Sequence, residues 1–168
     1  MKGRIVATLF ALPFFSVGVW MLWSLSMTFH DAYQMRSWVP VEAQVLSAGY
    51  RTNSGDDSDT YKAYVEYRYS YGGAYLIGDR VAIGSGSDNI GSYQQDMGNR
   101  LSRARANGTP IMVYVNPGEP TESIVDRDLR WGMIGFKSIF LFVFGGVGLF
   151  LLIAVWRAPK EKDDTLPQ

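Results

Sequence analysis

The chain has 168 residues, and its 16 basic and 16 acidic side chains cancel to a formal charge of zero, so its bulk charge predicts no polyanionic partner such as a nucleic acid. It contains no cysteine and one histidine, His30, which excludes disulfides, thiolate metal sites and sites with several histidine ligands. We therefore expect no metal and no cofactor, and we assign no catalytic residue.

The N-terminal part of the chain contains a long apolar segment. No ionisable side chain occurs from Ile5 to Phe29. Because about 20 helical residues cross the hydrocarbon core of a bilayer, this segment predicts a membrane-spanning helix. A signal peptide cleaved near Ser24 is the alternative, but its apolar region is usually only about 7 to 15 residues long. Lys2 and Arg4 precede the segment, so the positive-inside rule places the N-terminus in the cytoplasm.

A second apolar segment runs from Trp131 to Trp156 and contains one charge, Lys137. A central lysine costs roughly 3 kcal/mol on insertion scales, whereas each Leu, Ile, Phe or Val favours insertion by about 0.3 to 0.6 kcal/mol. Fifteen such residues between Ile134 and Val155 outweigh the lysine, and the long lysine stem carries the ammonium towards the interface. This segment is therefore predicted to span the membrane and to return the C-terminus to the cytoplasm.

The two predicted spans divide the chain into four parts. These are a cytoplasmic N-terminus with the first span (1–29), an extracytoplasmic domain (30–130), the second span (131–156) and a cytoplasmic polar tail (157–168). Residues 28–130 hold ten basic and thirteen acidic side chains. We therefore expect a weakly acidic domain to face the outside of the membrane.

The first half of the domain has a hydrophobic period of two. Apolar residues alternate with polar ones over 39–45, and the odd positions over 61–71 are aromatic or apolar. Both patterns predict strands with one buried face. The Gly-Gly pair at 72–73 suits the positive φ angles of a tight hairpin, so a partner strand is expected from Ala74 to about Val81. The polar stretch from Thr52 to Thr60 is expected to be a mobile loop.

The second half of the domain predicts one helix and two short strands. Apolar residues recur at helical spacing from Ser92 to Ala106, and Asp96 and Arg100 are placed to pair along that helix. Asn107-Gly108 supplies a helix end. Strands are expected at 109–115 and 123–125. The fold class is therefore membrane α+β: two transmembrane helices flanking a small antiparallel β-sheet or partial barrel domain with one short helix.

Three groups of residues carry a resemblance to a known family. They are Trp38 to Val45 directly after the first span, Val65 to Tyr69 with Gly73-Ala74-Tyr75, and Gly108 before Val113 to Pro117 with Pro120. In order and spacing they resemble the DUF3592 family of bacterial membrane proteins, over roughly residues 5–156. The resemblance implies a two-span protein of the bacterial inner membrane with a β-rich domain between its spans. It implies no established activity and no catalytic residues.

Four residues are candidate contacts to a partner or to lipid. Tyr64 lies on the strand face opposite the other tyrosines, so its ring is expected to be exposed. The other three are arginines of the predicted helix, Arg100, Arg103 and Arg105, whose positive charge suits anionic lipid headgroups. Arg127 and Arg130, close to the second span, could add to the same contact. Ordinary ion pairs on a solvated helix face are the alternative reading of these arginines.

Other polar and small residues have simpler readings. We interpret Asp56, Asp57 and Asp59 as a solvated loop rather than a calcium site, and Gly84 to Asp88 as a plain linker rather than an anion cradle. Small residues in the spans permit close helix approach, either between the two spans or in a homo-oligomer: Ala7, Ala11, Gly132, Gly135, Gly145, Gly146 and Gly148.

The sequence favours a non-catalytic integral membrane protein. We expect an accessory or scaffold subunit whose extracytoplasmic β-domain binds another envelope component, with the lipid bilayer and a membrane or envelope protein as partners. One alternative is an envelope enzyme that uses carboxylates on neighbouring strands, namely Glu42, Glu66 or Asp79. Another is a channel or transporter subunit, whose polar positions in the spans would be Ser16, Ser24, Lys137 and Ser138.

Overall fold

The computed structural model describes residues 2–84 and 86–157; residues 158–168 of the expected polar tail lie outside the described residues. Two compact units share the described chain. One combines the residues up to Leu25 with those from Ile134 onwards, and the other comprises Ser26–Met133.

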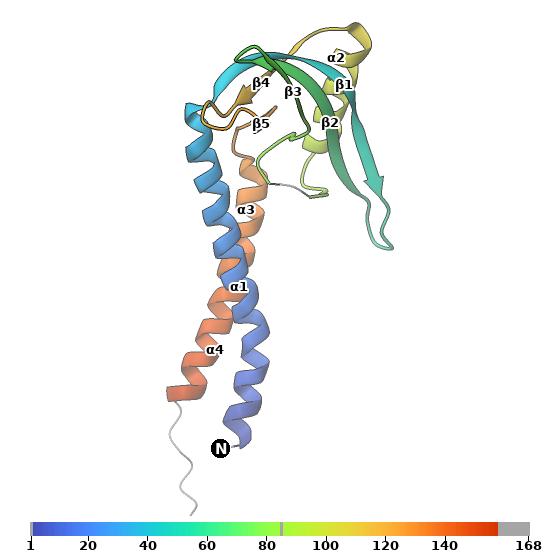
Figure 1. Cartoon of the computed structure of the whole chain (residues 1–168). Coiled ribbons are helices and arrows are strands. Elements are labelled where there is room, and N and C mark those ends of the chain that lie inside the picture. The colour runs from blue at the N-terminus through green and yellow to red at the C-terminus, as the bar shows by residue number, and fades with distance from the viewer. Residues whose placement is uncertain (1, 85, 158–168) are drawn as a thin grey trace, which may run out of the picture. The chain divides into compact units, whose positions relative to one another are not determined.

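Both apolar segments are helical. Helix α1 covers Lys2–Gln34, and the second segment consists of α3 (Trp131–Phe140), a π-helical turn (Leu141–Gly145) and α4 (Gly146–Arg157) (Figure 1). Each is long and apolar enough to cross a membrane. Most of their large apolar side chains are exposed, which is expected of helices that face lipid and not of core helices in a water-soluble domain.

The apolar helices pack on each other through glycine. A Cβ atom added at Gly18 would collide with the backbone of Gly145, and one added at Gly148 would collide with the backbone of Phe15. Lys137 donates a 2.9 Å hydrogen bond from Nζ to Oγ of Ser24. The expected close approach of the spans is confirmed. The expected position of the lysine at the membrane interface stays a prediction.

The second unit is built on a five-stranded sheet with the strand order β3-β2-β1-β4-β5, in which all neighbours are antiparallel. The strands are β1 (Val39–Asn53), β2 (Thr60–Tyr71), β3 (Ala74–Gly78), β4 (Ile111–Val115) and β5 (Ser123–Ile124). The predicted strands and hairpin are confirmed, although β1 is twice as long as the alternating pattern over 39–45 indicates.

A β-bulge at Leu46 explains why the pattern ends early. Before it, Val45 lies opposite Tyr67, and after it Ala48 lies opposite Val65, with one extra residue on β1. The extra residue reverses which positions face inward, because side chains alternate along a strand. Odd positions of β1 face the core before the bulge, and even positions face it afterwards.

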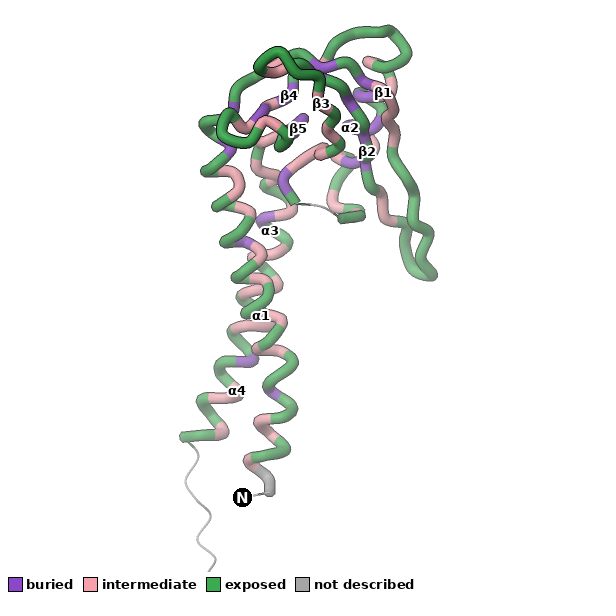
Figure 2. The backbone as a smooth tube through the Cα atoms, in the orientation of Figure 1, coloured by how far each residue is buried: buried purple, intermediate pink, exposed green. Residues whose placement is uncertain are grey.

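Helix α2 (Tyr93–Asn107) covers the inner face of the sheet. The predicted helix end is confirmed: Gly108 has a φ angle of +64° and caps the last carbonyl groups. The helix approaches β1 closely, since a Cβ atom at Gly98 would lie 2.7 Å from the carbonyl oxygen of Gly49. The buried core lies between this helix and the strands (Figure 2): Ala43, Val45, Ala63, Val65, Tyr67, Tyr69, Met97, Leu101, Val113, Val115 and Val125.

The predicted pairing of Asp96 with Arg100 is wrong within the described residues. The Ser92 hydroxyl, one turn earlier, donates a 2.6 Å hydrogen bond to Asp96. Arg100 turns towards the sulfur of Met97, at 3.2 Å. The acidic group is therefore satisfied at the start of the helix, where a negative charge also suits the helix dipole.

Candidate binding cavity

The first half of β2 lacks a neighbouring strand on one side. Strand β3 was expected to continue to about Val81, but it pairs with β2 only as far as Gly78. Beyond it the chain changes partner: Val125 donates a 3.0 Å backbone hydrogen bond to Arg80, and Asp126 donates one of 2.8 Å to Val81. The departure of the chain uncovers the edge of β2.

Two other groups cap part of this edge. Tyr61 exchanges two backbone hydrogen bonds of 2.9 Å with Asp88, and the backbone N–H of Ala63 donates to Oε1 of Gln94 at 2.9 Å. The edge is therefore faced by the loop after β3 and by the start of α2. An open cavity of about 720 Å³ lies between them.

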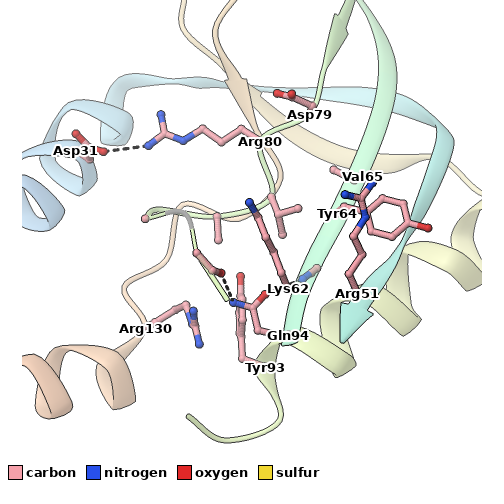
Figure 3. A pocket seen from close by; sticks show the side chains of 15 residues that line it. Asp31, Arg51, Lys62, Tyr64, Val65, Asp79, Arg80, Tyr93, Gln94 and Arg130 are labelled. Carbon is pink, nitrogen blue, oxygen red and sulfur yellow. Dashed lines mark hydrogen bonds and ion pairs between the residues drawn. The ribbon is translucent and has the colours of Figure 1, made fainter. Parts of the chain in front are cut away.

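The cavity walls come from separate parts of the second unit, as Figure 3 shows. They include the end of α1, both strands of the β1–β2 hairpin, the loop after β3, the first turn of α2 and the residue before α3. The lining residues are Asp31, Arg51, Lys62, Ala63, Tyr64, Val65, Asp79, Arg80, Val81, Ala82, Gly84, Gly86, Tyr93, Gln94 and Arg130.

Two ion pairs frame the cavity. Arg130 donates two hydrogen bonds of 2.9 Å to Asp88, and its guanidinium lies 4.2 Å from the centre of the Tyr93 ring. The side chains of this pair are only 14% and 11% exposed, whereas those of Arg80 and Asp31, 3.0 Å apart, are 40% and 30% exposed. The first pair is therefore a fixed part of the wall, and the second is solvated.

Asp88 is held in its ionised form. Burial by itself raises the pKa of this carboxyl, but the hydrogen bonds from Arg130 and Gln94 and the charge of Arg130 outweigh burial. Gln94 donates from Nε2 at 2.6 Å, and the Ile90 N–H donates at 3.2 Å. The net effect lowers the pKa of Asp88 below its ordinary value. Ionised Asp88, in the loop after β3, thus connects this loop to α2 through Gln94 and to the residue before α3, Arg130.

Tyr93 is a neutral donor at the same wall. Burial raises the pKa of its hydroxyl, and the hydrogen bond to the Asp126 carboxylate, 2.8 Å long, raises it further. The phenol therefore keeps its proton at neutral pH and remains fixed on Asp126.

Two more cations of the lining lie directly opposite each other. Arg51 on β1 pairs in register with Lys62 on β2. Within the described ranges, neither side chain lies within ion-pair distance of a carboxylate. The Arg51 guanidinium lies 5.3 Å from the centre of the Tyr64 ring. Figure 3 shows Lys62 extending over the cavity while Arg51 runs beside that ring.

The cavity is more basic than the domain that contains it. Its lining has four cationic side chains, Arg51, Lys62, Arg80 and Arg130, and two carboxylates, Asp31 and Asp79. Residues 28–130 as a whole carry three more acidic than basic groups. Asp31 and Asp88 neutralise Arg80 and Arg130, so Arg51 and Lys62 against Asp79 leave a small excess of positive charge, which favours an anion in the cavity.

The structure does not bring the four sequence-predicted contact residues together. Tyr64 lines the cavity and is 37% exposed. Arg100 lines a second, smaller hollow of about 390 Å³ with Asp126 and Asp128. Arg103 and Arg105 are exposed on α2 and line neither hollow.

The two arginines near the second apolar segment are engaged within the domain. Arg127 donates to the backbone carbonyl groups of Met35 and Trp38, at 2.8 and 3.1 Å, and lies over the Tyr114 ring. Arg130 is engaged by Asp88. Both guanidinium groups hold the domain together.

The carboxylates of the enzyme alternative are dispersed. Asp79 lines the cavity. Glu42 lies on β1 opposite Met112, and Glu66 lies on β2 opposite Ser47. Both glutamates are exposed and outside the cavity lining.

Sequence reasoning missed the most buried ion pair. The stretch from Gly84 to Asp88 was expected to be a plain linker, and that expectation is wrong for Asp88, which bonds to Tyr61, Gln94 and Arg130. Its partner lies 42 positions further along the chain. A single sequence carries no periodic signal over such a separation. In the described part of the chain, no group of three His, Asp or Glu residues is placed to hold a metal ion.

Comparison with known protein families places the domain in one of them. Residues 41–130 match the family model described as "Domain of unknown function (DUF3592)", which confirms the resemblance found in the sequence. The matched segment contains every residue of the cavity lining except Asp31, and it ends at Arg130. No curated protein matches the chain.

Proposed function

The chain belongs to the DUF3592 family, a family of unknown function, and on this premise we propose from its geometry that it is a membrane-anchored binding protein. In this proposal it is a non-catalytic accessory or scaffold subunit, and its β-domain binds another component of the cell envelope. The open basic cavity beside β2 is the observation that carries the proposal.

The two apolar helices support the anchoring part of the proposal. Both are long and apolar enough to cross a bilayer. Lys2 and Arg4, in the first turn of α1 and before its apolar run, favour a cytoplasmic N-terminus, so the β-domain would face outwards. We place the protein in a bacterial inner membrane with both termini in the cytoplasm.

The cavity supports the binding part of the proposal. Ligand sites in proteins are usually concave, largely preformed and equipped with a few fixed polar groups. Here the bidentate pair of Arg130 with Asp88 fixes one wall, and Tyr93 is held by Asp126. Tyr64 stands exposed at the opposite side, on β2, where it can contact a bound component.

Site-specific photocrosslinking in native membranes tests this proposal. A photoreactive phenylalanine analogue is placed at Tyr64, and a matched one at Tyr75, which is 80% exposed on β3 and lies outside the cavity lining. Crosslinked products are identified by mass spectrometry. We expect one companion, or a second copy of the chain, from position 64 and not from position 75. Absence of any reproducible crosslink at position 64 would overturn the proposal.

A further inference from the structure

We propose that Arg51 and Lys62 form a binding site for a phosphate group in the cavity beside β2. The proposal deepens the binding function proposed above, on which it rests, by naming the chemistry of the ligand. Like charges directly opposite each other on antiparallel strands destabilise a sheet, and Arg51 and Lys62 are such a pair. A bound anion removes this repulsion.

The β-bulge at Leu46 determines which face of the sheet Arg51 occupies. Without the extra residue at Leu46, the odd positions of β1 would keep facing α2, as Ala43 and Val45 do. The bulge turns Arg51 to the outer face of the sheet, beside Lys62 and Tyr64. Bulges often redirect a side chain next to a functional site.

Tyr64 and Gly49 hold the arginine in place. The Tyr64 ring lies across Gly49, where a Cβ atom would be 2.8 Å from the tyrosine hydroxyl. Because glycine leaves this space open, the ring can lie along β1 and stack against the Arg51 guanidinium at 5.3 Å. The guanidinium is therefore partly ordered before any ligand arrives, which lowers the entropic cost of binding.

The neighbouring carboxylates leave this cation pair available. Asp31 is bonded to Arg80, and Asp88 is bonded to Arg130. Asp79, the remaining carboxylate of the lining, has no ion-pair partner among the described residues. Arg51 and Lys62 both line the cavity, and among the described residues neither lies within ion-pair distance of a carboxylate.

Phosphate is the anion that suits this pair best. A guanidinium offers two parallel donors to phosphate oxygens, and a lysine ammonium adds a point charge with three donors. Two sources fit the position. Arg130 directly precedes Trp131, the first residue of α3, so the phosphate of an anionic lipid is one source, and a soluble phosphate ester is the other.

Titration calorimetry of the full chain in a neutral detergent tests the site. The probes are short-chain phosphatidylglycerol, short-chain phosphatidylcholine and glycerol 3-phosphate. We expect Lys62→Gln and Arg51→Gln each to weaken binding about fivefold and the double variant about 25-fold, since a basic residue near an anionic surface contributes about 1 kcal/mol. Lys62→Arg keeps the charge and should bind within about twofold of the wild type.

Arg68→Gln is the matched control. Arg68 is also exposed on the outer face of β2, and it bonds to Gln44 outside the cavity. Its variant should bind as the wild type does. Preference for phosphatidylglycerol identifies a lipid headgroup, and equal binding of glycerol 3-phosphate identifies a soluble ester; both results support the site. Equal losses in the Arg68 and Lys62 variants, or no wild-type binding of any probe, would overturn it.

The two proposals fail separately. The crosslink at Tyr64 reports a macromolecular companion and needs no phosphate. A retained crosslink without phosphate binding overturns only the phosphate site, and phosphate binding without a crosslink overturns only the proposed companion. A thermal unfolding midpoint for each variant no lower than that of the wild type confirms that the loss of binding is not a loss of folding.

Discussion

Arg130 donates one hydrogen bond of 2.9 Å to each carboxylate oxygen of Asp88. The two residues lie 42 positions apart in the sequence, and together they join the loop after β3 to the start of α3. Gln94 of α2 adds a third bond to the same carboxylate. One carboxylate therefore organises three segments that wall the cavity.

Replacing this carboxylate should destabilise the β-domain. In Asp88→Asn the charged hydrogen bonds from Arg130 are weakened, and Arg130, whose side chain is only 14% exposed, loses its counter-ion. We expect a loss of about 1.5 to 3 kcal/mol in the free energy of unfolding. Urea unfolding of the detergent-solubilised chain, followed by circular dichroism, measures the loss. Asp57→Asn at the exposed hairpin tip is the control, and an equal loss there would contradict the role of Asp88.

The same carboxylate should make stability depend on pH in acid. The pKa of Asp88 is lower in the folded domain than in the unfolded chain, where it is about 3.9. Its stabilising effect is therefore complete above the unfolded pKa and is lost as the pH falls through the folded one. The stability difference between wild type and Asp88→Asn should be largest near neutral pH and should shrink in acid. A difference that stays constant down to about pH 2.5 would contradict this assignment.

A buried hydroxyl pair should also contribute to the fold. The Tyr67 side chain is fully buried, and its hydroxyl is 2.9 Å from Oγ of Ser123. Tyr67→Phe leaves that serine hydroxyl without its partner, so we expect a loss of about 1 kcal/mol in the free energy of unfolding. Tyr75→Phe, at a position that is 80% exposed, should change the same quantity by less than about 0.5 kcal/mol. Similar values for the two variants would show that the pair contributes nothing.

Local sequence patterns predict most of the regular structure here. The odd-numbered aromatic residues of β2, the Gly-Gly turn and the glycine that ends α2 each act within a few residues, so one sequence displays them. The bulge at Leu46 has no such signature, because it depends on how β1 pairs with β2. The period-two pattern therefore ends at Val45 although the strand continues to Asn53.

The cavity was less predictable than the strands because its residues come from segments that are far apart in the sequence. Its residues converge from α1, the hairpin, the loop after β3 and the segment before α3. Tyr64 was identified because the strand alternation exposes its ring. Arg51 was not, since the odd-numbered pattern of β1 would have pointed it inward without the bulge. The site forms where segments that are distant in the sequence come together in the fold, and the local periodicity of a sequence does not indicate such contacts.

Glycine packing between the apolar helices should be sensitive to a single methyl group. A Cβ atom at Gly148 would collide with the backbone of Phe15, whereas one at Gly146, in the same helix, would meet nothing within 4 Å. Gly148→Ala should therefore lower the thermal unfolding midpoint of the helix pair in detergent. Gly146→Ala should leave it unchanged or raise it, because alanine favours helix. A shift of the same sign and size in both variants would contradict the observed packing.

The orientation of the chain can be tested with a reporter enzyme that is active only outside the cytoplasm. Gly55 lies at the exposed tip of the β1–β2 hairpin, so an insertion there disturbs no strand pairing. Lys2 and Arg4 lie in the first turn of α1, before its apolar run, and basic residues at a span end favour the cytoplasmic side. We therefore expect activity from a fusion at Gly55 and none from a fusion after Gln168. The opposite result would place the β-domain in the cytoplasm and would remove the basis for an envelope partner.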